Sequence, residues 1–330
     1  MNYMTGRLEK EFKEMEKIQG QLNVLPPIIK DFYYYMEASD KSYTTIKHYI
    51  NYVVHFMNYY TNGKYDNEFY KNVTPSTINM YMSSIKFIKD QNGKNIKIGN
   101  SIRATRWSAL NTFFNYLKSN NLITDNPLSQ TFRPSNKNEK KIIYLTEDEI
   151  KLCLSNIDSS GSNMFKNRDM CIISLGISTG LRVSAITQIN IEDIDFQNNT
   201  INVIEKGNKY RVINFGDNLK EKIVAWLEDR NKYYGDIETN ALFISRKKNR
   251  ISVDAVAELL KKYTKNIDKN ITPHKLRATC ATNLYKKTKD IYIVANQLGH
   301  ANVATTKIYT EIDSDAKLKA ASILDNLIDK

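Results

Sequence analysis

Residues 200–215 read TINVIEKGNKYRVINF, and this stretch decides where the chain forms a sheet. The runs TINVIE (200–205) and KYRVINF (209–215) are rich in β-branched and aromatic residues. Between them, Lys206-Gly207-Asn208 are residues that suit a hairpin turn. A third run, ALFIS (241–245), is predicted as a further strand. The sequence therefore predicts a small antiparallel sheet in the second half of the chain.

Helical patterns surround this sheet. Upstream, Thr146 followed by Glu149 is a capping-box signature, and the apolar run 168–178 predicts a buried helix. Downstream, residues 252–328 are predicted to form several helices. We therefore expect a C-terminal α+β domain over residues 142–330.

The first part of the chain shows helical periodicity throughout. Apolar residues such as Ile28, Ile29 and Phe32 form one stripe, and similar stripes follow. Helices are expected at 5–22, near 75–90 and at 102–119. The fold class is thus mostly α, with an all-helical N-terminal domain.

Turn residues divide the chain. The segment 121–135 contains two prolines and ends the helical block, and residues 136–141 are polar and aperiodic. The predicted organisation is an N-terminal extension, a helical domain, a linker and the C-terminal domain, at 1–24, 25–135, 136–141 and 142–330.

Charge points to a polyanionic partner. The chain has 330 residues and a net charge of +12, and neutralising phosphates releases counterions, which drives binding. Composition alone leaves DNA, RNA and an acidic membrane surface open. Basic residues gather in two clusters, and a solvated face is the alternative for either one alone. One cluster in each domain favours a protein that grips a duplex, with these candidate contacts: Lys86, Lys89, Lys94, Lys97, Arg103, Arg106, Arg246, Lys247 and Lys248.

Other site classes find little support. Cys153, Cys171 and Cys280 are odd in number and widely spaced, which argues against a disulfide framework and a zinc site. No run approaches the ~18 apolar residues of a membrane span, so we expect a cytoplasmic protein without a membrane partner. Asp193 and Asp195 could begin a metal site, but acids ahead of a strand are more often turn and capping residues. No metal cofactor is expected.

The chemistry is concentrated in a series of short motifs. They are TGLRVS (179–184), Lys206 in the hairpin, HKLR (274–277), LGH (298–300) and Tyr309. Singly, each has an ordinary structural explanation. Together they supply two Arg, two His, a Lys and a Tyr, and two of the four histidines of the chain fall in these motifs.

This set suits phosphodiester transfer without a metal. Guanidinium groups bind phosphate through paired hydrogen bonds and stabilise its growing negative charge. Histidine titrates in the range needed to accept a proton from a phenol, and a lysine can protonate a leaving oxygen.

In order and spacing, these motifs resemble those of the tyrosine recombinase family of phage integrases and Xer-type enzymes. The resemblance covers about residues 25–328. It implies a SAM-like core-binding domain followed by the catalytic domain, and a site-specific recombinase that needs neither metal nor ATP. Carried over, Arg182 and Arg277 clamp the scissile phosphate, and Lys206 protonates the 5′ oxygen. His274 acts as general base, His300 donates a hydrogen bond, and Tyr309 forms a 3′-phosphotyrosyl bond.

The resemblance also implies partners. They are double-stranded DNA with a short inverted-repeat site and further copies of the chain, a tetramer on DNA and a monomer or dimer when free. A second recombinase or an accessory protein is a further partner that the family admits. The C-terminal residues 314–328 are expected to form a helix that docks onto a neighbouring protomer, or onto its own domain.

One position departs from the family pattern. Three residues after Arg182 the family usually has an acid, whereas this chain has Ala185. A catalytically weakened DNA-binding relative is therefore one alternative, and type IB topoisomerase-like strand cleavage is another.

Overall fold

The computed structural model describes most of the chain as two compact units, divided between Glu139 and Lys140. The described residues are 3–64, 67–89, 93–135, 142–160, 164–205, 209–235, 239–299, Thr306 and Tyr309. The expected linker and the expected helix at 314–328 therefore lie outside them. Within these ranges no helix is long and apolar enough to span a bilayer.

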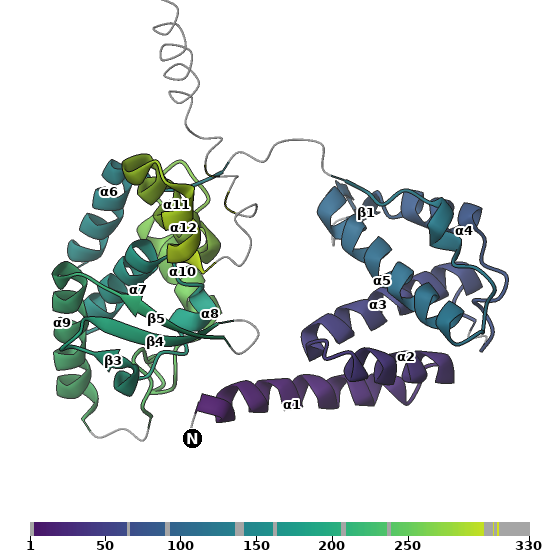
Figure 1. Ribbon diagram of the computed structural model, residues 1–330, viewed down its shortest axis with the longest axis horizontal. Coiled ribbons are helices and arrows are strands. Elements are labelled where there is room, and N and C mark those ends of the chain that lie inside the picture. The colour runs from purple at the N-terminus through teal and green to yellow at the C-terminus, as the bar shows by residue number, and fades with distance from the viewer. Residues whose placement is uncertain are drawn as a thin grey trace, which may run out of the picture. The chain divides into compact units, whose positions relative to one another are not determined.

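The first unit is built from helices and one small hairpin (Figure 1). Several helices begin at side-chain caps: Ser42 accepts from the Thr45 amide, and Thr74 forms a capping box with Thr77. Its elements are α1 (Tyr3–Leu22), α2 (Pro27–Ala38), α3 (Tyr43–Thr61), α4 (Pro75–Ser84), β1 (Phe87–Lys89), β2 (Asn95–Lys97), α5 (Asn100–Ser119) and η1 (Pro127–Gln130).

Aromatic side chains fill the core of this unit. Phe32 of α2 packs edge-on against Phe113 of α5, with ring centroids 5.1 Å apart, and both are fully buried. Ile18 and Leu22 of α1 join the same core, so the end of the N-terminal extension packs against the helices that follow it.

The hairpin β1–β2 differs from the sequence-based expectation. A helix was predicted near 75–90, but α4 ends at Ser84 and residues 87–89 pair antiparallel with 95–97. The turn contains Gly93 with a φ of 75°, which a helix does not accommodate. The N-terminal unit is therefore mostly, rather than entirely, helical.

The second unit places helices around a three-stranded antiparallel sheet of order β3-β4-β5. The capping box predicted at Thr146 and Glu149 is confirmed at the start of α6. The elements are α6 (Glu147–Asp158), α7 (Lys166–Thr179), α8 (Val183–Ile186), η2 (Ile191–Asp193), β3 (Ile194–Asp195), β4 (Thr200–Glu205), β5 (Lys209–Asn214), α9 (Asp217–Tyr234), α10 (Val253–Tyr263), α11 (Pro273–Thr288) and α12 (Ile291–Leu298).

The predicted hairpin is confirmed as β4 and β5, which pair from Thr200↔Asn214 to Glu205↔Lys209. Alternate residues of the pair face the core, where Ile201 and Val203 pack near Trp226 of α9. The mostly helical fold class with a small antiparallel sheet is therefore confirmed.

The prediction of a third strand at 241–245 is wrong. Residues 241–244 form only isolated bridges, Asn190↔Ala241 and Ile244↔Arg250, and β3 is the strand that pairs with β4. Leu242 and Phe243 are fully buried in the core, which explains why the run is apolar without belonging to the sheet.

Candidate active site

The TGLR motif lies at the end of α7, where the chain turns into α8. Gly180 ends α7 with a φ of 66°, a left-handed conformation that favours glycine. The Thr179 hydroxyl donates to the Leu175 carbonyl at 2.6 Å and accepts from the Leu181 amide at 3.2 Å. The half-buried Arg182 follows as the N-cap residue of α8. These bonds fix the backbone from which Arg182 projects.

Helix α11 carries Arg277 into the interior. This residue is only 2% exposed. Its Nη1 donates to the Gly180 carbonyl at 2.8 Å and its Nη2 to the Leu298 carbonyl at 2.5 Å. Both carbonyls lie at helix C-termini, where the helix dipole is negative. These contacts offset the cost of burying the charge and orient the guanidinium group.

His274 lies three residues before Arg277, at the start of α11. Its pKa is lowered from the usual value, first by partial burial and then by the positive charges of Arg277, Lys275 and Arg182. Neutral imidazole is the form that accepts a proton, so the lowered pKa favours a base at neutral pH. The same charges show that Arg182 and Arg277 both lie near this ring.

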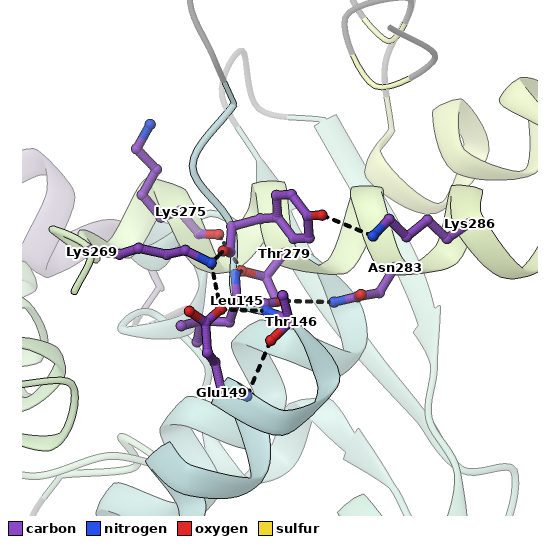
Figure 2. A network of polar contacts seen from close by, with 9 residues as sticks. Leu145, Thr146, Glu149, Lys269, Lys275, Thr279, Asn283 and Lys286 are labelled. Carbon is purple, nitrogen blue, oxygen red and sulfur yellow. Dashed lines mark hydrogen bonds and ion pairs between the residues drawn. The ribbon is translucent and has the colours of Figure 1, made fainter. Parts of the chain in front are cut away.

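The middle of α11 is anchored to the segment that leads into α6 (Figure 2). The buried Thr279 hydroxyl accepts from the Leu145 amide at 2.9 Å, and Asn283 Nδ2 donates to the Leu145 carbonyl at 3.0 Å. Lys269 forms an ion pair with Glu149 at 2.6 Å. The helix that bears His274 and Arg277 is thus held in place by its polar contacts as well as by apolar packing.

Tyr309 lies in an apolar pocket of the same unit and is 5% exposed. Burial raises the pKa of its phenol and the neighbouring Cys280 raises it too, whereas the positive charge of Arg277 lowers it. The residues packed with Tyr309 are Ala278, Ala281, Val294 and Leu298. The phenol is therefore close enough to Arg277 for its charge to act on it, and its raised pKa keeps it protonated at neutral pH.

The end of α12 joins three of the motifs. Gln297 Nε2 donates to the Thr179 carbonyl at 3.2 Å, and a Cβ on Gly180 would lie 2.8 Å from Leu298 Cδ2. Arg211 of β5 donates through Nη2 to the carbonyls of Asn296, at 3.1 Å, and Gln297. The TGLR turn, the hairpin and the helix before LGH therefore meet at one point.

Arg211 and Gln297 were not identified from the sequence. A signal for Arg211 was present, because it occupies an inward-facing position of β5, opposite the buried Val203. A charged residue at such a position requires a partner within the fold.

Arg277 is the residue that links the candidate site: its charge and that of Arg182 lower the pKa of His274, and its charge also lowers the pKa of Tyr309. Lys206 and His300 lie outside the described residues. Ala185, at the position where the family usually has an acid, is buried in the core beside Ile186.

The candidate DNA contacts fall into two kinds. In the first unit, Lys86 precedes β1 and Lys89 ends it. Lys94 precedes β2 and Lys97 ends it. The exposed members of both clusters are Lys86, Lys94, Lys97, Arg246, Lys247 and Lys248.

Arg103 and Arg106 of α5 are instead partly buried and bound within their own unit. Arg103 Nη2 donates to the Met82 carbonyl at 3.0 Å. The Arg106 guanidinium lies over the Tyr52 ring, 5.3 Å from its centroid. These contacts give both side chains a role in joining α5 to its neighbours.

The two acids considered for a metal site serve the backbone. Asp193 accepts from the Asn190 amide at 2.7 Å, and Asp195 accepts from the Gln197 amide at 2.8 Å. The capping and turn interpretation is confirmed. In the part of the chain that the structure describes, no group of three or more His, Cys, Asp or Glu is placed to hold a metal ion.

Residues 144–315 match the model of the phage integrase family. The tyrosine recombinase XerC of Caldanaerobacter subterraneus subsp. tengcongensis is 39% identical over 224 residues, 66% of this chain and 61% of that protein. The tyrosine recombinase XerS of Streptococcus thermophilus is 35% identical over 191 residues, 57% of this chain and 53% of that protein. The matched part is thus less than two thirds of the length of these two relatives.

Solved structures share the fold. The XerH site-specific recombinase bound to a palindromic difH substrate has a TM-score of 0.67 at 23% identity, over 87% of this chain and 82% of that one. A lambda integrase(75–356) dimer bound to a COC′ core site has a TM-score of 0.65 at 17% identity, over 86% and 94%.

Proposed function

Because this chain belongs to the phage integrase family, whose model matches residues 144–315, we propose that it is a site-specific DNA recombinase. It cuts one strand of duplex DNA through a 3′-phosphotyrosyl bond and rejoins that strand to a new partner. The charges of Arg182 and Arg277 both lower the pKa of His274, and that of Arg277 lowers the pKa of the Tyr309 phenol, which supports a shared site for phosphate transfer.

The arginines hold the scissile phosphate. Arg182 and Arg277 bind its non-bridging oxygens through paired hydrogen bonds and stabilise the charge that grows during attack. Arg277 is well suited to this role because two backbone carbonyls fix its orientation before substrate arrives. No reorganisation of that guanidinium is then needed at the moment of reaction.

Tyr309 is the nucleophile. Its phenolic oxygen attacks phosphorus as His274 accepts the phenolic proton, and the bond from phosphorus to the 5′ oxygen breaks. Lys206 gives a proton to that oxygen, and His300 donates a hydrogen bond to the transition state. Attack by a 5′ hydroxyl on the phosphotyrosine reverses these steps with His274 as acid, so the bond energy is conserved without ATP.

The substrate is double-stranded DNA with a short inverted-repeat site. Lys86, Lys94 and Lys97 on the first unit and Lys247 on the second are exposed and contact backbone phosphates. The remaining candidate contacts are Lys89, Arg103, Arg106, Arg246 and Lys248. Four copies assemble on two sites from free monomers or dimers, and a second recombinase or accessory protein joins them where the site requires it. The proposed location is the cytoplasm.

Ala185 supports one second candidate, a DNA-binding relative without catalysis. Its methyl group is buried in the core and cannot replace a carboxylate that orients catalytic groups. The complete set of Arg182, Lys206, His274, Arg277, His300 and Tyr309 favours the enzyme.

The two candidates are separated on a nicked suicide substrate that carries the cognate site. Wild type is expected to form a covalent protein–DNA adduct, because the short 5′ fragment diffuses away and religation stops. Tyr309→Phe is expected to bind the same DNA without forming the adduct.

Wild-type protein that binds the site but forms no adduct would contradict the enzyme. Relaxation of a supercoiled plasmid that lacks the site would instead indicate type IB topoisomerase-like cleavage.

A further inference from the structure

Arg211 belongs to the inner face of β5. The neighbouring residues Tyr210 and Val212 are 79% and 61% exposed, whereas Ile213 and the cross-strand partner Val203 are buried. The strand alternation therefore directs the Arg211 side chain away from solvent and toward the helices of the unit.

The guanidinium of Arg211 reaches the last turn of α12. It donates to the carbonyls of Asn296 and Gln297, which lie among the last carbonyls of the helix; the Asn296 carbonyl also accepts from the Gly299 amide at 3.0 Å. Arg277 binds the next carbonyl, that of Leu298. Three consecutive carbonyls at the negative end of α12 are thus bound by two arginines, one of them from the hairpin.

Gly299 has no side chain and so leaves room for the guanidinium of Arg211. A Cβ at this position would lie 2.7 Å from Arg211 Nη1, and the residue has a φ of 65°. The glycine of the LGH motif therefore both turns the chain after α12 and lets the arginine lie against it.

We propose that Arg211 is a positioning residue that fixes the β4–β5 hairpin against α12 and so sets the place of Lys206 at the phosphate. This inference rests on the proposed function, in which Lys206 is the general acid. Lys206 directly follows β4, and Arg211 lies two residues after the start of β5, which is roughly 7 Å along a strand.

The hairpin needs such a fixed point. Its outer face carries the exposed Tyr210 and Val212, so packing holds it mainly from the inner side. The register of β4 and β5 fixes the strands to each other, and the contact of Arg211 with α12 places the pair relative to the helix whose last carbonyl binds Arg277. A misplacement of about 1 Å at a reacting group costs on the order of 10²-fold in rate.

The test compares two leaving groups. An ordinary phosphodiester needs a proton on its departing 5′ oxygen, whereas a 5′-bridging phosphorothiolate releases a thiolate that needs none. Arg211→Ala is expected to cleave the ordinary suicide substrate about 10²-fold more slowly than wild type, and the sulfur substrate at close to the wild-type rate. Lys206→Ala is expected to show the same pattern.

Arg230→Ala is the matched control. Arg230 also donates to a backbone carbonyl, that of Thr239 at 2.7 Å, but from α9. It should reduce both rates by the same factor, if it reduces them at all. Because the ratio of the two rates is taken within one preparation, loss of folded protein cancels.

An equal loss of both rates in Arg211→Ala would overturn the inference and leave Arg211 with a purely structural role. Wild type that forms no adduct on either substrate would instead refute the proposed function, and with it the inference.

Discussion

Arg277 connects three helices of the second unit, because it lies on α11 and its side chain reaches α7 and α12. It binds the carbonyl ends of α7 and α12 while its charge acts on His274 and Tyr309. A guanidinium can do this because its donors form a rigid planar fork, whereas an ammonium is a compact point charge on a flexible stem. The same guanidinium group thus stabilises the fold and lowers the pKa of both His274 and Tyr309.

Arg277→Lys should lower both cleavage and stability. The lysine keeps the charge but cannot bridge the carbonyls of Gly180 and Leu298 and still bind a phosphate through two hydrogen bonds. We expect single-turnover cleavage to fall by about 10²–10³-fold and the free energy of unfolding by about 1–3 kcal/mol. Suicide-substrate kinetics and urea unfolding measure the two effects. Cleavage at the wild-type rate by this variant would contradict the role of Arg277 in holding the phosphate.

His274 should determine the acid limb of the pH profile. Partial burial and three nearby cations lower its pKa, so the neutral base persists below the ordinary value of about 6.5. At subsaturating DNA, the cleavage rate constant should rise with pH and reach half its plateau below that value. If the His274→Gln variant no longer shows this rise of rate with pH, the titrating group is His274. A midpoint above 7 in wild type that His274→Gln removes would contradict the lowered pKa.

Motif order predicted the candidate catalytic side chains, but not how they are held. The sequence distinguished Arg182, His274, Arg277 and Tyr309 because phosphate transfer requires those chemical types in combination. It did not reveal Arg211, since spacing along a chain does not say which carbonyl a long side chain will reach. Nor did it reveal that the Tyr309 phenol lies in an apolar pocket.

Helix α11 depends on its attachment to the segment that leads into α6. Thr279→Val removes the hydroxyl that accepts from the Leu145 amide but keeps the shape of the side chain. The buried amide loses its partner, so the free energy of unfolding should fall by about 1–3 kcal/mol. Urea unfolding measures the change. Thr279→Ser retains the acceptor and should lose less, and a Thr279→Val protein as stable as wild type would contradict this role.

Local patterns predicted the β4–β5 hairpin because turn residues and β-branched runs agree there. They failed at 241–245, where burial alone makes the run apolar, and at β1–β2, whose strands are only three residues long. Short strands leave little periodic signal, and their pairing depends on contacts that are distant in sequence.

Exposed lysines on the protein surface should determine how DNA binding depends on salt. Replacing Lys86, Lys94 and Lys97 with alanine removes up to three phosphate contacts. The slope of log Kobs against log salt should become shallower by up to about 2.7, because each contact contributes about 0.9. Fluorescence anisotropy with a duplex at several salt concentrations measures it.

The matched control replaces Lys151, Lys261 and Lys287, which are also exposed but belong to neither basic cluster. This triple variant has the same net charge as the test variant and should keep the wild-type slope. Equal slopes for the two triple variants would show that net charge, rather than the β1–β2 surface, governs binding.

One phenol among the 21 tyrosines of the chain is expected to become joined to DNA. The adduct trapped on the suicide substrate can be digested with protease and nuclease and its tyrosine located by tandem mass spectrometry. The nucleotide is predicted on Tyr309. A nucleotide on any other residue would contradict Tyr309 as the nucleophile.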